Sequence, residues 1–260
     1  MRDEVPLLLL DPVLLKQYVQ HEGSVDSMEV EYEHHRVEKR GLQLMKDRIK
    51  YWVSRDFRTA VSRNALDTLM NSLKPGDLAL SIGGGPMRVH EALVNLNIGP
   101  FPNVDIVADA HSLPYSSGCV DAIHCEAVLE HVRTPVKVVE EMLRVLKPGG
   151  RVYACTPFLQ NYHGYPNHFQ NFTLTGHCAL FEDRGFRIIE SGVAVGPMVA
   201  LTDMASTLAA EFAPAHLRNL AYWFVRLGGL VVRPLDIWMN RAHAAYVLAS
   251  STFLVAERPK

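Results

Sequence analysis

The region between residues 78 and 191 alternates short apolar runs with segments of helical period. In residues 136–146, apolar side chains recur every three or four positions, which predicts a helix that the Pro-Gly-Gly of residues 148–150 ends. Short strands separated by helices predict βαβ units, and therefore a parallel sheet with helices on both faces. The apolar runs that we expect to form strands are residues 78–82, 93–98, 104–108, 122–125, 151–155 and 186–191.

Helical period dominates both flanks of this region. Residues 1–75 are polar and helical in pattern, and we expect them to form an N-terminal helical lid. Residues 76–260 would form the main domain, which contains a helical insertion at about residues 197–243. The elements expected within and after this insertion are helices at residues 198–213 and 216–227 and a β-branched run at residues 249–256 that is able to close the sheet.

The composition limits the partners and the compartment. With 26 Lys and Arg against 28 Asp and Glu, the net charge is −2, so we expect no nucleic-acid partner, which needs a basic surface. The apolar stretch at residues 220–235 is interrupted by two arginines and a proline, so no membrane span is expected. The four cysteines form no CxxC pair, which favours a reduced, cytoplasmic protein.

The first apolar run ends in a glycine-rich turn, Gly83-Gly84-Gly85. Glycines at the carboxyl end of a strand let a ligand approach the backbone closely, and ligands of open α/β sheets bind at these strand ends. The turn does not spell the G-x-G-x-x-G that dinucleotide folds use to hold pyrophosphate. It therefore favours an uncharged or zwitterionic nucleoside as the ligand.

Three further motifs follow the glycine turn in order: VDIVADAHSLPY at residues 104–115, VDAIHCEAVLEHV at residues 120–132 and RVLKPGGRV at residues 144–152. Together they resemble the class I S-adenosylmethionine-dependent methyltransferases, in the UbiE-like (type 11) group, from residue 78 to about residue 173. The resemblance implies an α/β fold with a Rossmann-like methyltransferase sheet. It also implies S-adenosyl-L-methionine as cofactor and methyl transfer to a small molecule as the activity.

The resemblance also implies which side chains bind the cofactor. Glycines of the first turn would line its methionine portion, and Asp109 would accept a hydrogen bond from the adenine amine. The second strand should end in an acid that binds the ribose hydroxyls, but Asn97 stands there and lacks the charge-assisted hydrogen bond of a carboxylate. The connection from the turn to residue 93 is short, which implies an abbreviated first helix. The implied cofactor-binding residues are Gly83, Gly84, Gly85, Asn97, Asp109, Ala110, His111 and Glu126.

The segment after the fifth predicted strand, residues 156–173, resembles the signature P-F-x-x-x-Y-H-x-x-P-x-D-[FY]-x-R-[FY]-T of one subgroup of these enzymes. His168 stands where the signature has Asp, and Asn171 where it has Arg. We expect this loop to bind the acceptor, and its amide and aromatic side chains favour a saccharide. There is also a faint resemblance to sugar O-methyltransferases of polymethylated polysaccharide biosynthesis. The expected substrate-binding residues are Tyr162, Tyr165, His168 and Asn171.

Methyl transfer to a hydroxyl needs a base, because the oxygen must lose its proton. His163 is the leading candidate, since its loop should project over the cleft, and His131 is the second, since it matches a histidine that similar sugar O-methyltransferases use as the base. No HExxH motif or histidine pair at i, i+4 points to a metal site, so none is expected.

Two alternatives to the saccharide hydroxyl remain open. One is a C- or N-methyltransferase of a quinone-like or amine metabolite, since these acceptors have less need of a base. The other is a methyltransferase fold that binds its ligand without catalysis, which Asn97 and the short first connection would suit. The oligomeric state, including a homodimer, also stays open.

Overall fold

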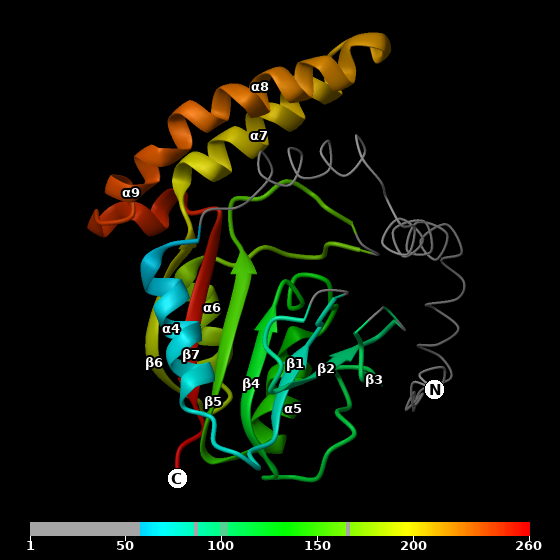
Figure 1. Ribbon diagram of the computed structural model, residues 1–260, viewed down its shortest axis with the longest axis vertical. Coiled ribbons are helices and arrows are strands. Elements are labelled where there is room, and N and C mark those ends of the chain that lie inside the picture. The colour runs from blue at the N-terminus through cyan, green and yellow to red at the C-terminus, as the bar shows by residue number, and fades with distance from the viewer. Residues whose placement is uncertain (1–57, 86–87, 100, 102, 165–166) are drawn as a thin grey trace.

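The computed structural model describes residues 58–260, except residues 86–87, 100, 102 and 165–166. These residues form a seven-stranded sheet in the order β3-β2-β1-β4-β5-β7-β6 (Figure 1). The first five strands in this order are parallel, and β7 runs antiparallel to both of its neighbours. The strands are β1 (Ala79–Ile82), β2 (Leu93–Asn97), β3 (Ile106–Val107), β4 (Val120–Glu126), β5 (Leu146–Pro157), β6 (Arg187–Val195) and β7 (Ser251–Glu257).

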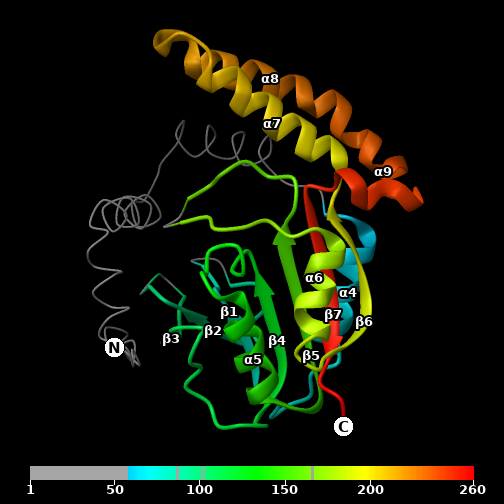
Figure 2. The same cartoon turned by 180° about the vertical axis from the view of Figure 1, so that it is seen from behind.

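Helices cover both faces of the sheet, as the alternating pattern predicted. Helix α4 lies on one face, and α5 and α6 lie on the other (Figures 1 and 2). The described helices are α4 (Ala60–Asn71), α5 (Pro135–Val145), α6 (Leu174–Glu182), α7 (Pro197–Glu211), α8 (Arg218–Val232) and α9 (Asp236–Met239), with short 3-10 turns η1 (Ala215–Leu217), η2 (Arg233–Leu235) and η3 (His243–Leu248). The predicted α/β class and the helical insertion near the C-terminus are confirmed.

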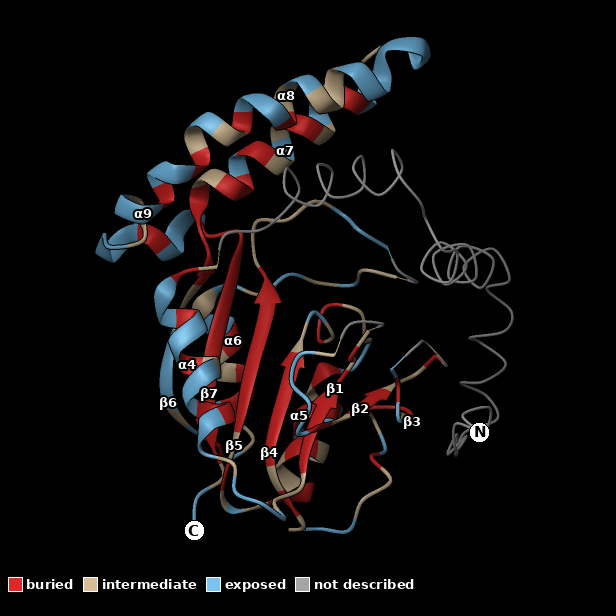
Figure 3. Cartoon of the chain, viewed as in Figure 1, coloured by how far each residue is buried: buried red, intermediate tan, exposed pale blue. Residues whose placement is uncertain are grey.

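Side chains that alternate along the strands build two separate cores. On the face covered by α5 and α6, Ile123 of the central strand β4 shares a buried cluster with Met142 and Phe181. On the opposite face, Tyr153 shares a second cluster with Leu69 of α4. Each such buried apolar side chain contributes about 1.5–3 kcal/mol to stability. The strands at the centre of the sheet are therefore buried on both sides (Figure 3) and hold their carboxyl ends rigidly.

The start of β5 and the connection after β1 differ from the predictions. Strand β5 begins at Leu146, so the KPGG segment that ends α5 also starts the strand, and Gly149 adopts a positive φ of 83° there. Between β1 and β2, the described residues form turns and bends with no helix, where the sequence implied an abbreviated one. Arg88 ties this connection down by donating to the carbonyl oxygen of Leu93 at 2.5 Å and to Asp105 at 2.7 Å.

The predicted N-terminal lid, residues 1–75, lies mostly outside the described residues. Its described end forms α4, which packs on the sheet rather than over the strand ends. Thr59 begins this helix, since its side chain accepts a hydrogen bond from the backbone N–H of Ser62 at 3.1 Å. The lid itself stays a prediction.

Helices α7 and α8 pair as a hairpin that lies beyond the carboxyl ends of the parallel strands (Figures 1 and 2). Helix α8 continues through Gly228 and Gly229, past the end predicted at residue 227. A side chain at Gly229 would overlap Thr202 of α7, so the missing Cβ is what lets the two helices approach. Within the described part of the chain, no helix combines the length and the apolarity needed to cross a bilayer.

Asp236 of α9 holds the start of α7 in place. Its buried carboxylate accepts hydrogen bonds from the backbone N–H groups of Met198 at 2.9 Å and Val199 at 3.3 Å, in the first turn of α7. A second set of charges, Asp203 with Arg226 and Arg233, ties α7 to α8. The start of α7 is therefore capped by a residue that lies 37 or more positions away.

Candidate functional site

The strand order reverses between β1 and β4, and this reversal locates the site. Connections leave these two strands toward opposite sides, which opens a crevice at their carboxyl ends. The glycine turn after β1, the end of β2, Asp109 after β3, residues 126–131 after β4 and the loop after β5 all reach this edge. The edge gathers most of the residues that the sequence singled out.

The three glycines after β1 have different roles. Gly83 has a φ of +74°, and its Cβ would overlap Val128, so the fold itself requires glycine there. A Cβ at Gly84 would overlap the amide of Asn95. Gly85 has no described atom within 4 Å of its ideal Cβ. Of the three, Gly85 is the one that borders open space, so it is the glycine best placed to make room for a ligand.

Two asparagines of β2 hold this turn in place. Asn97 donates from Nδ2 to the carbonyl oxygen of Gly84 at 3.0 Å and accepts from the N–H of Gly99 at 3.0 Å. Asn95 donates to the carbonyl oxygen of Gly85 at 3.2 Å and was missed by sequence reasoning, although strand alternation places it on the same side of β2 as Asn97. The amide at the predicted ribose position therefore braces the glycine turn.

Asp109, just after β3, is buried and already hydrogen-bonded. Its Oδ1 accepts from the backbone N–H of His111 at 2.9 Å and lies 2.7 Å from the ring Nδ1 of that residue. Burial alone would raise the pKa of Asp109, but the hydrogen bonds from His111 outweigh it and lower the pKa below its usual value. The carboxylate is thus charged and oriented by His111, while Ala110 between them is part of the buried core.

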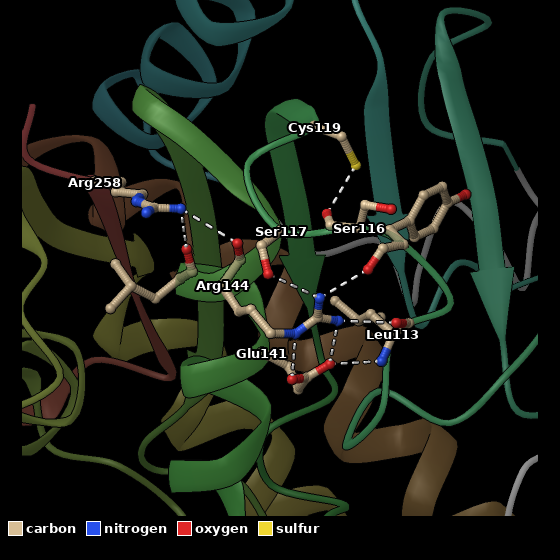
Figure 4. Close-up of polar contacts among 9 residues, drawn as sticks. Leu113, Ser116, Ser117, Cys119, Glu141, Arg144 and Arg258 are labelled. Carbon is tan, nitrogen blue, oxygen red and sulfur yellow. Dashed lines mark hydrogen bonds and ion pairs between the residues drawn. The ribbon is translucent and has the colours of Figure 1, made fainter.

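The turn that follows Asp109 is fixed to α5. Glu141 accepts from the N–H of Leu113 at 2.8 Å, and Arg144 donates to the carbonyl oxygens of Leu113 at 3.0 Å and Tyr115 at 2.8 Å (Figure 4). Arg144 also pairs with Glu141 at 2.7 Å, so one charged pair satisfies the backbone of the whole turn. This side of the site is rigid before any ligand binds.

Glu126, at the end of β4, belongs to a polar network on the α4 side of the sheet. It forms an ion pair with Arg58 and lies 3.3 Å from Nε2 of His124, whose Nδ1 lies 3.2 Å from Oγ of Ser81. Burial, with a smaller effect of the Arg58 charge, lowers the pKa of His124 to about 4, so this imidazole is neutral. Glu126 therefore links the start of the described chain to the strand ends.

The loop after β5 is clamped onto the segment after β4. Gln170 donates from Nε2 to the carbonyl oxygens of Leu129 at 3.0 Å and Val132 at 2.9 Å. The backbone N–H of Phe169 donates to the carbonyl oxygen of Glu130 at 2.8 Å. Two segments that are separate in the sequence are thereby joined at the strand edge.

This clamp brings the two predicted bases together. The rings of His131 and His163 lie 5.2 Å apart, and His168 lies 4.2 Å from His163 and 5.8 Å from His131. Nδ1 of His131 lies 2.6 Å from the carbonyl oxygen of Asn167, and Nδ1 of His163 lies 2.9 Å from that of Asn161. A carbonyl only accepts, so each Nδ1 donates a proton to it, and in the neutral ring the lone pair is then on Nε2.

The other predicted acceptor residues differ in their surroundings. Tyr162 is 74% exposed and stacks on His168 at 5.9 Å. His168 lies 2.6 Å from the side-chain oxygen of Asn171. Tyr165 lies outside the described residues. The amide of Asn171 also donates to the carbonyl oxygen of Gln160 at 3.1 Å, so it helps to shape the loop.

Glu130 is the residue of this edge that sequence reasoning missed. Its side chain is buried at 0% exposure, and among the described residues neither carboxylate oxygen has a hydrogen-bond partner. Burial raises the pKa of Glu130 to about 7. The signal was an acid inside the apolar run Val128-Leu129-Glu130-His131-Val132.

Glu130, His131 and His163 form one group, with a ligand atom from each lying within 4.8 Å of the others. The expectation of no metal site rested on sequence spacing, which does not register ligands that come from two loops.

Comparisons with known proteins agree with this geometry. Residues 87–154 match the methyltransferase domain family. The chain is 32% identical over 92 residues to an uncharacterized 37.1 kDa protein in transposon TN4556 of Streptomyces fradiae, covering 35% of this chain and 26% of that protein. It is 28% identical over 140 residues to the ubiquinone/menaquinone biosynthesis C-methyltransferase UbiE of Enterobacter sp. (strain 638), covering 51% of this chain and 53% of the relative.

Among solved structures, a phosphoethanolamine N-methyltransferase 2 of Haemonchus contortus in complex with S-adenosyl-L-methionine is 15% identical, with a TM-score of 0.47, and the match covers 81% of this chain and 56% of that chain. The chain spans between about a quarter and a half of the two curated relatives. The match to the methyltransferase domain family covers residues 87–154, which include β2, β3, β4 and the first part of β5, and therefore the strand ends at which Asp109 and Glu126 lie.

Proposed function

We propose that this protein transfers the methyl group of S-adenosyl-L-methionine to a hydroxyl group of a small molecule. The observation that carries this proposal is the group of Glu130, His131 and His163 at the carboxyl end of β4. Both imidazoles keep an Nε2 lone pair, because each Nδ1 donates to a backbone carbonyl. A hydroxyl nucleophile needs such acceptors, whereas an enolate carbon or a free amine needs them much less.

The cofactor would occupy the edge between β1 and Asp109. Gly85 borders open space, which suits the methionine portion of the cofactor. Asp109 is charged and fixed by His111, so its carboxylate suits the exocyclic amine of adenine. Asn97 would reach the ribose only at the expense of its bonds to the glycine turn, so it is the weakest of the proposed cofactor contacts.

Methyl transfer is an in-line displacement at carbon. The acceptor oxygen forms a bond to the methyl carbon as the carbon–sulfur bond breaks, and the sulfonium becomes the neutral thioether of S-adenosylhomocysteine. The proton of the hydroxyl must leave in the same process, and in the simplest form of the proposal it passes to Nε2 of His163 or His131. The enzyme otherwise contributes alignment, which its clamped loop and rigid strand ends support.

For the acceptor, we retain a saccharide hydroxyl as the first candidate. The exposed face of Tyr162, stacked on His168, offers the apolar surface on which a sugar ring can lie. The loop amides give weaker support for a saccharide, because several of them already form hydrogen bonds within the protein. The amide of Asn161 donates to Asp203 and Thr207 of α7, and that of Gln170 is occupied by the clamp. A quinone-like acceptor methylated at carbon is the second candidate, favoured by the likeness to the UbiE relative.

The test is transfer of isotope-labelled methyl from S-adenosyl-L-methionine to matched panels of saccharides and prenylated phenols. We expect a product on oxygen, with kcat falling 10²–10⁴-fold in His163→Ala or His131→Ala, as for a lost general base, and falling at low pH in the wild type. His216→Ala, in the exposed turn η1, is the matched control. Product on carbon or nitrogen, with both histidine variants near wild-type rate, would overturn the hydroxyl proposal.

A further inference from the structure

We propose that Glu130, His131 and His163 bind a divalent transition-metal ion of the Zn²⁺ type at the carboxyl end of β4. The ligand atoms already lie within 4.8 Å of one another. Around a tetrahedral ion with bonds of about 2.0–2.2 Å, the ligand atoms lie about 3.3–3.6 Å apart, so small rotations of side chains would complete the site. Two imidazole nitrogens and one carboxylate are a donor set that suits Zn²⁺, Co²⁺, Mn²⁺ and Fe²⁺.

Glu130 gives an independent reason to expect a cation. Its carboxylate is buried, and neither oxygen has a hydrogen-bond partner in the part of the chain that the structure describes. Among the described residues, the one ion-pair contact of Glu130 is with Nε2 of His131, at 3.8 Å. An unpaired buried carboxylate costs several kcal/mol. A bound cation would supply the missing charge at the place where His131 and His163 offer their lone pairs.

The surroundings of the two histidines are those of metal ligands. In metal sites, the ring nitrogen that does not bind the ion usually donates to a carbonyl or carboxylate, which fixes the ring. Nδ1 of His131 lies 2.6 Å from the carbonyl oxygen of Asn167, and Nδ1 of His163 lies 2.9 Å from that of Asn161. Both carbonyls belong to the loop after β5, so this loop would set the site.

His168 stands beside this group but is not one of its ligands. Its Nδ1 accepts from the backbone N–H of His163 at 3.3 Å, and its Nε2 lies 2.6 Å from the side-chain oxygen of Asn171. Both ring nitrogens are therefore occupied, and His168 acts as a positioning residue for His163. The protein supplies three ligands, which is the number typical of zinc sites that keep a position open for water or substrate.

The role of the ion in methyl transfer rests on the proposed function, whereas its binding does not. An acceptor hydroxyl that coordinates the open position has its pKa lowered by the ion, as a zinc-bound water does. Its proton leaves to water, its oxygen forms the bond to the methyl carbon, and the carbon–sulfur bond breaks. The two histidines would then act as ligands, and neither would need to take the proton.

The direct test is Co²⁺ binding to the chelator-treated full-length chain, followed by its visible absorption bands, with Zn²⁺ titrated as competitor. We expect about one ion per chain, and at least a 100-fold weaker affinity in Glu130→Gln and in His163→Gln. His163 is exposed, so its variant does not threaten the fold. His216→Gln, in the exposed turn η1, is the matched control and should change Co²⁺ affinity by less than tenfold. Absence of the bands, or equal affinity in wild type and His163→Gln, would overturn the site.

Binding of S-adenosylhomocysteine, measured on the same samples by calorimetry, separates the two proposals. Co²⁺ binding without cofactor binding would support the metal site and contradict the methyltransferase function. Methyl transfer at an unchanged rate after complete removal of metal would contradict the role of the ion and leave the methyltransferase function intact. A rate that falls on chelation and returns with Zn²⁺ or Co²⁺ would support both.

Discussion

Nε2 of His168 lies 2.6 Å from the side-chain oxygen of Asn171. The loop signature that residues 156–173 resemble has an acid and an arginine at these positions, so the two departures of this chain contact each other. A hydrogen-bonded histidine and amide stand where the signature has two opposite charges. The loop thus has a contact between these positions without a guanidinium near His131 and His163, where a guanidinium would repel a protonated histidine or a bound cation.

This relationship predicts coupling between the two positions. In His168→Asp or Asn171→Arg alone, one charge faces a neutral partner, and we expect each variant to lose about 1 kcal/mol of unfolding free energy. In the double variant the charges pair, and we expect a favourable coupling of about 0.2–1 kcal/mol, the range of partly exposed ion pairs. Urea unfolding of all four proteins measures it. Strict additivity would show that the two side chains act independently.

The glycine turn predicts different outcomes for two similar substitutions. Gly85→Val should keep the thermal midpoint within a few degrees and lose S-adenosylhomocysteine binding, because its side chain enters open space next to the strand ends. Gly83→Val should lower the free energy of unfolding by about 1–3 kcal/mol, because it combines a positive φ with an overlap on Val128. Calorimetry and thermal unfolding distinguish them. A folded Gly85→Val with unchanged affinity would remove this turn from the cofactor site.

Asp109 should mainly affect cofactor affinity, whereas Asn97 should mainly affect thermal stability. Asp109→Ala should weaken cofactor binding by about 1.5–3 kcal/mol, the range for a hydrogen bond to a charged group. Asn97→Ala should lower affinity less and lower the thermal midpoint more, because its amide braces Gly84 and Gly99. Affinity and midpoint are measured on both variants. The reverse order of affinities would mean that β2 and not β3 carries the main cofactor contact.

His177 predicts a pH dependence of stability. Its ring is buried, with Nδ1 near the hydroxyls of Thr156 at 3.4 Å and Thr252 at 3.2 Å, and burial lowers its pKa to about 3. In the unfolded chain a histidine has a pKa of about 6.5. Between about pH 3 and pH 6.5 the unfolded chain therefore binds more protons than the folded chain. Stability should therefore be full above pH 6.5 and fall by up to about 1.4 kcal/mol per pH unit as the pH drops toward 3.

Unfolding of wild type and His177→Asn between pH 7 and pH 5 checks this expectation. The variant should start less stable, because it leaves a gap in the core, but its stability should fall less steeply with pH. Part of the slope should remain, because His124, with a pKa of about 4, contributes in the same direction. Parallel curves for the two proteins would show that the pKa of His177 is the same in the folded and the unfolded chain.

Asp236 predicts a local opening of the hairpin. Asp236→Ala removes both side-chain hydrogen bonds to the start of α7 and should cost about 1–2 kcal/mol, as for a lost helix cap. We expect faster proteolysis and faster amide exchange in α7 and α9, with little change in β4 and β5. Asp236→Asn, which keeps an acceptor oxygen, is the matched control. Equal exchange in the sheet and the hairpin would mean that the insertion opens only with global unfolding.

Local pattern predicted much of the fold. The alternation of apolar runs located each strand of the sheet, because a buried strand needs an apolar run whatever it pairs with. The end of helix α8 is a feature that the local pattern predicted wrongly. This helix was expected to end at residue 227, and the glycines that follow at 228 and 229 each weaken a helix by about 1 kcal/mol. Contact between Gly229 and Thr202 overrides that propensity, and it depends on a partner helix that the local pattern does not reveal.

The candidate site divides in the same way. Residues at strand ends, such as Gly85 and Asp109, follow from the order of elements and the family resemblance. Glu130 does not, because its significance comes from His163, which the clamp by Gln170 brings beside it. The loop amides were also counted as acceptor contacts, although backbone groups occupy those of Gln170 and Asn171. Whether a polar side chain is already hydrogen-bonded within the protein depends on the folded structure, so the sequence alone does not reveal it.

Strand β7 comes last in the described chain, yet it lies between β5 and β6. A nascent chain that has emerged only as far as α9 therefore carries two strands whose facing edges lack their partner. The 55 residues that separate Val195 from Ser251 take roughly 3–11 seconds to synthesise, at 5–20 residues per second. Unpaired strand edges can pair with strands of other chains. During those seconds the edges of β5 and β6 are therefore open to pairing with nascent chains on neighbouring ribosomes of the same mRNA.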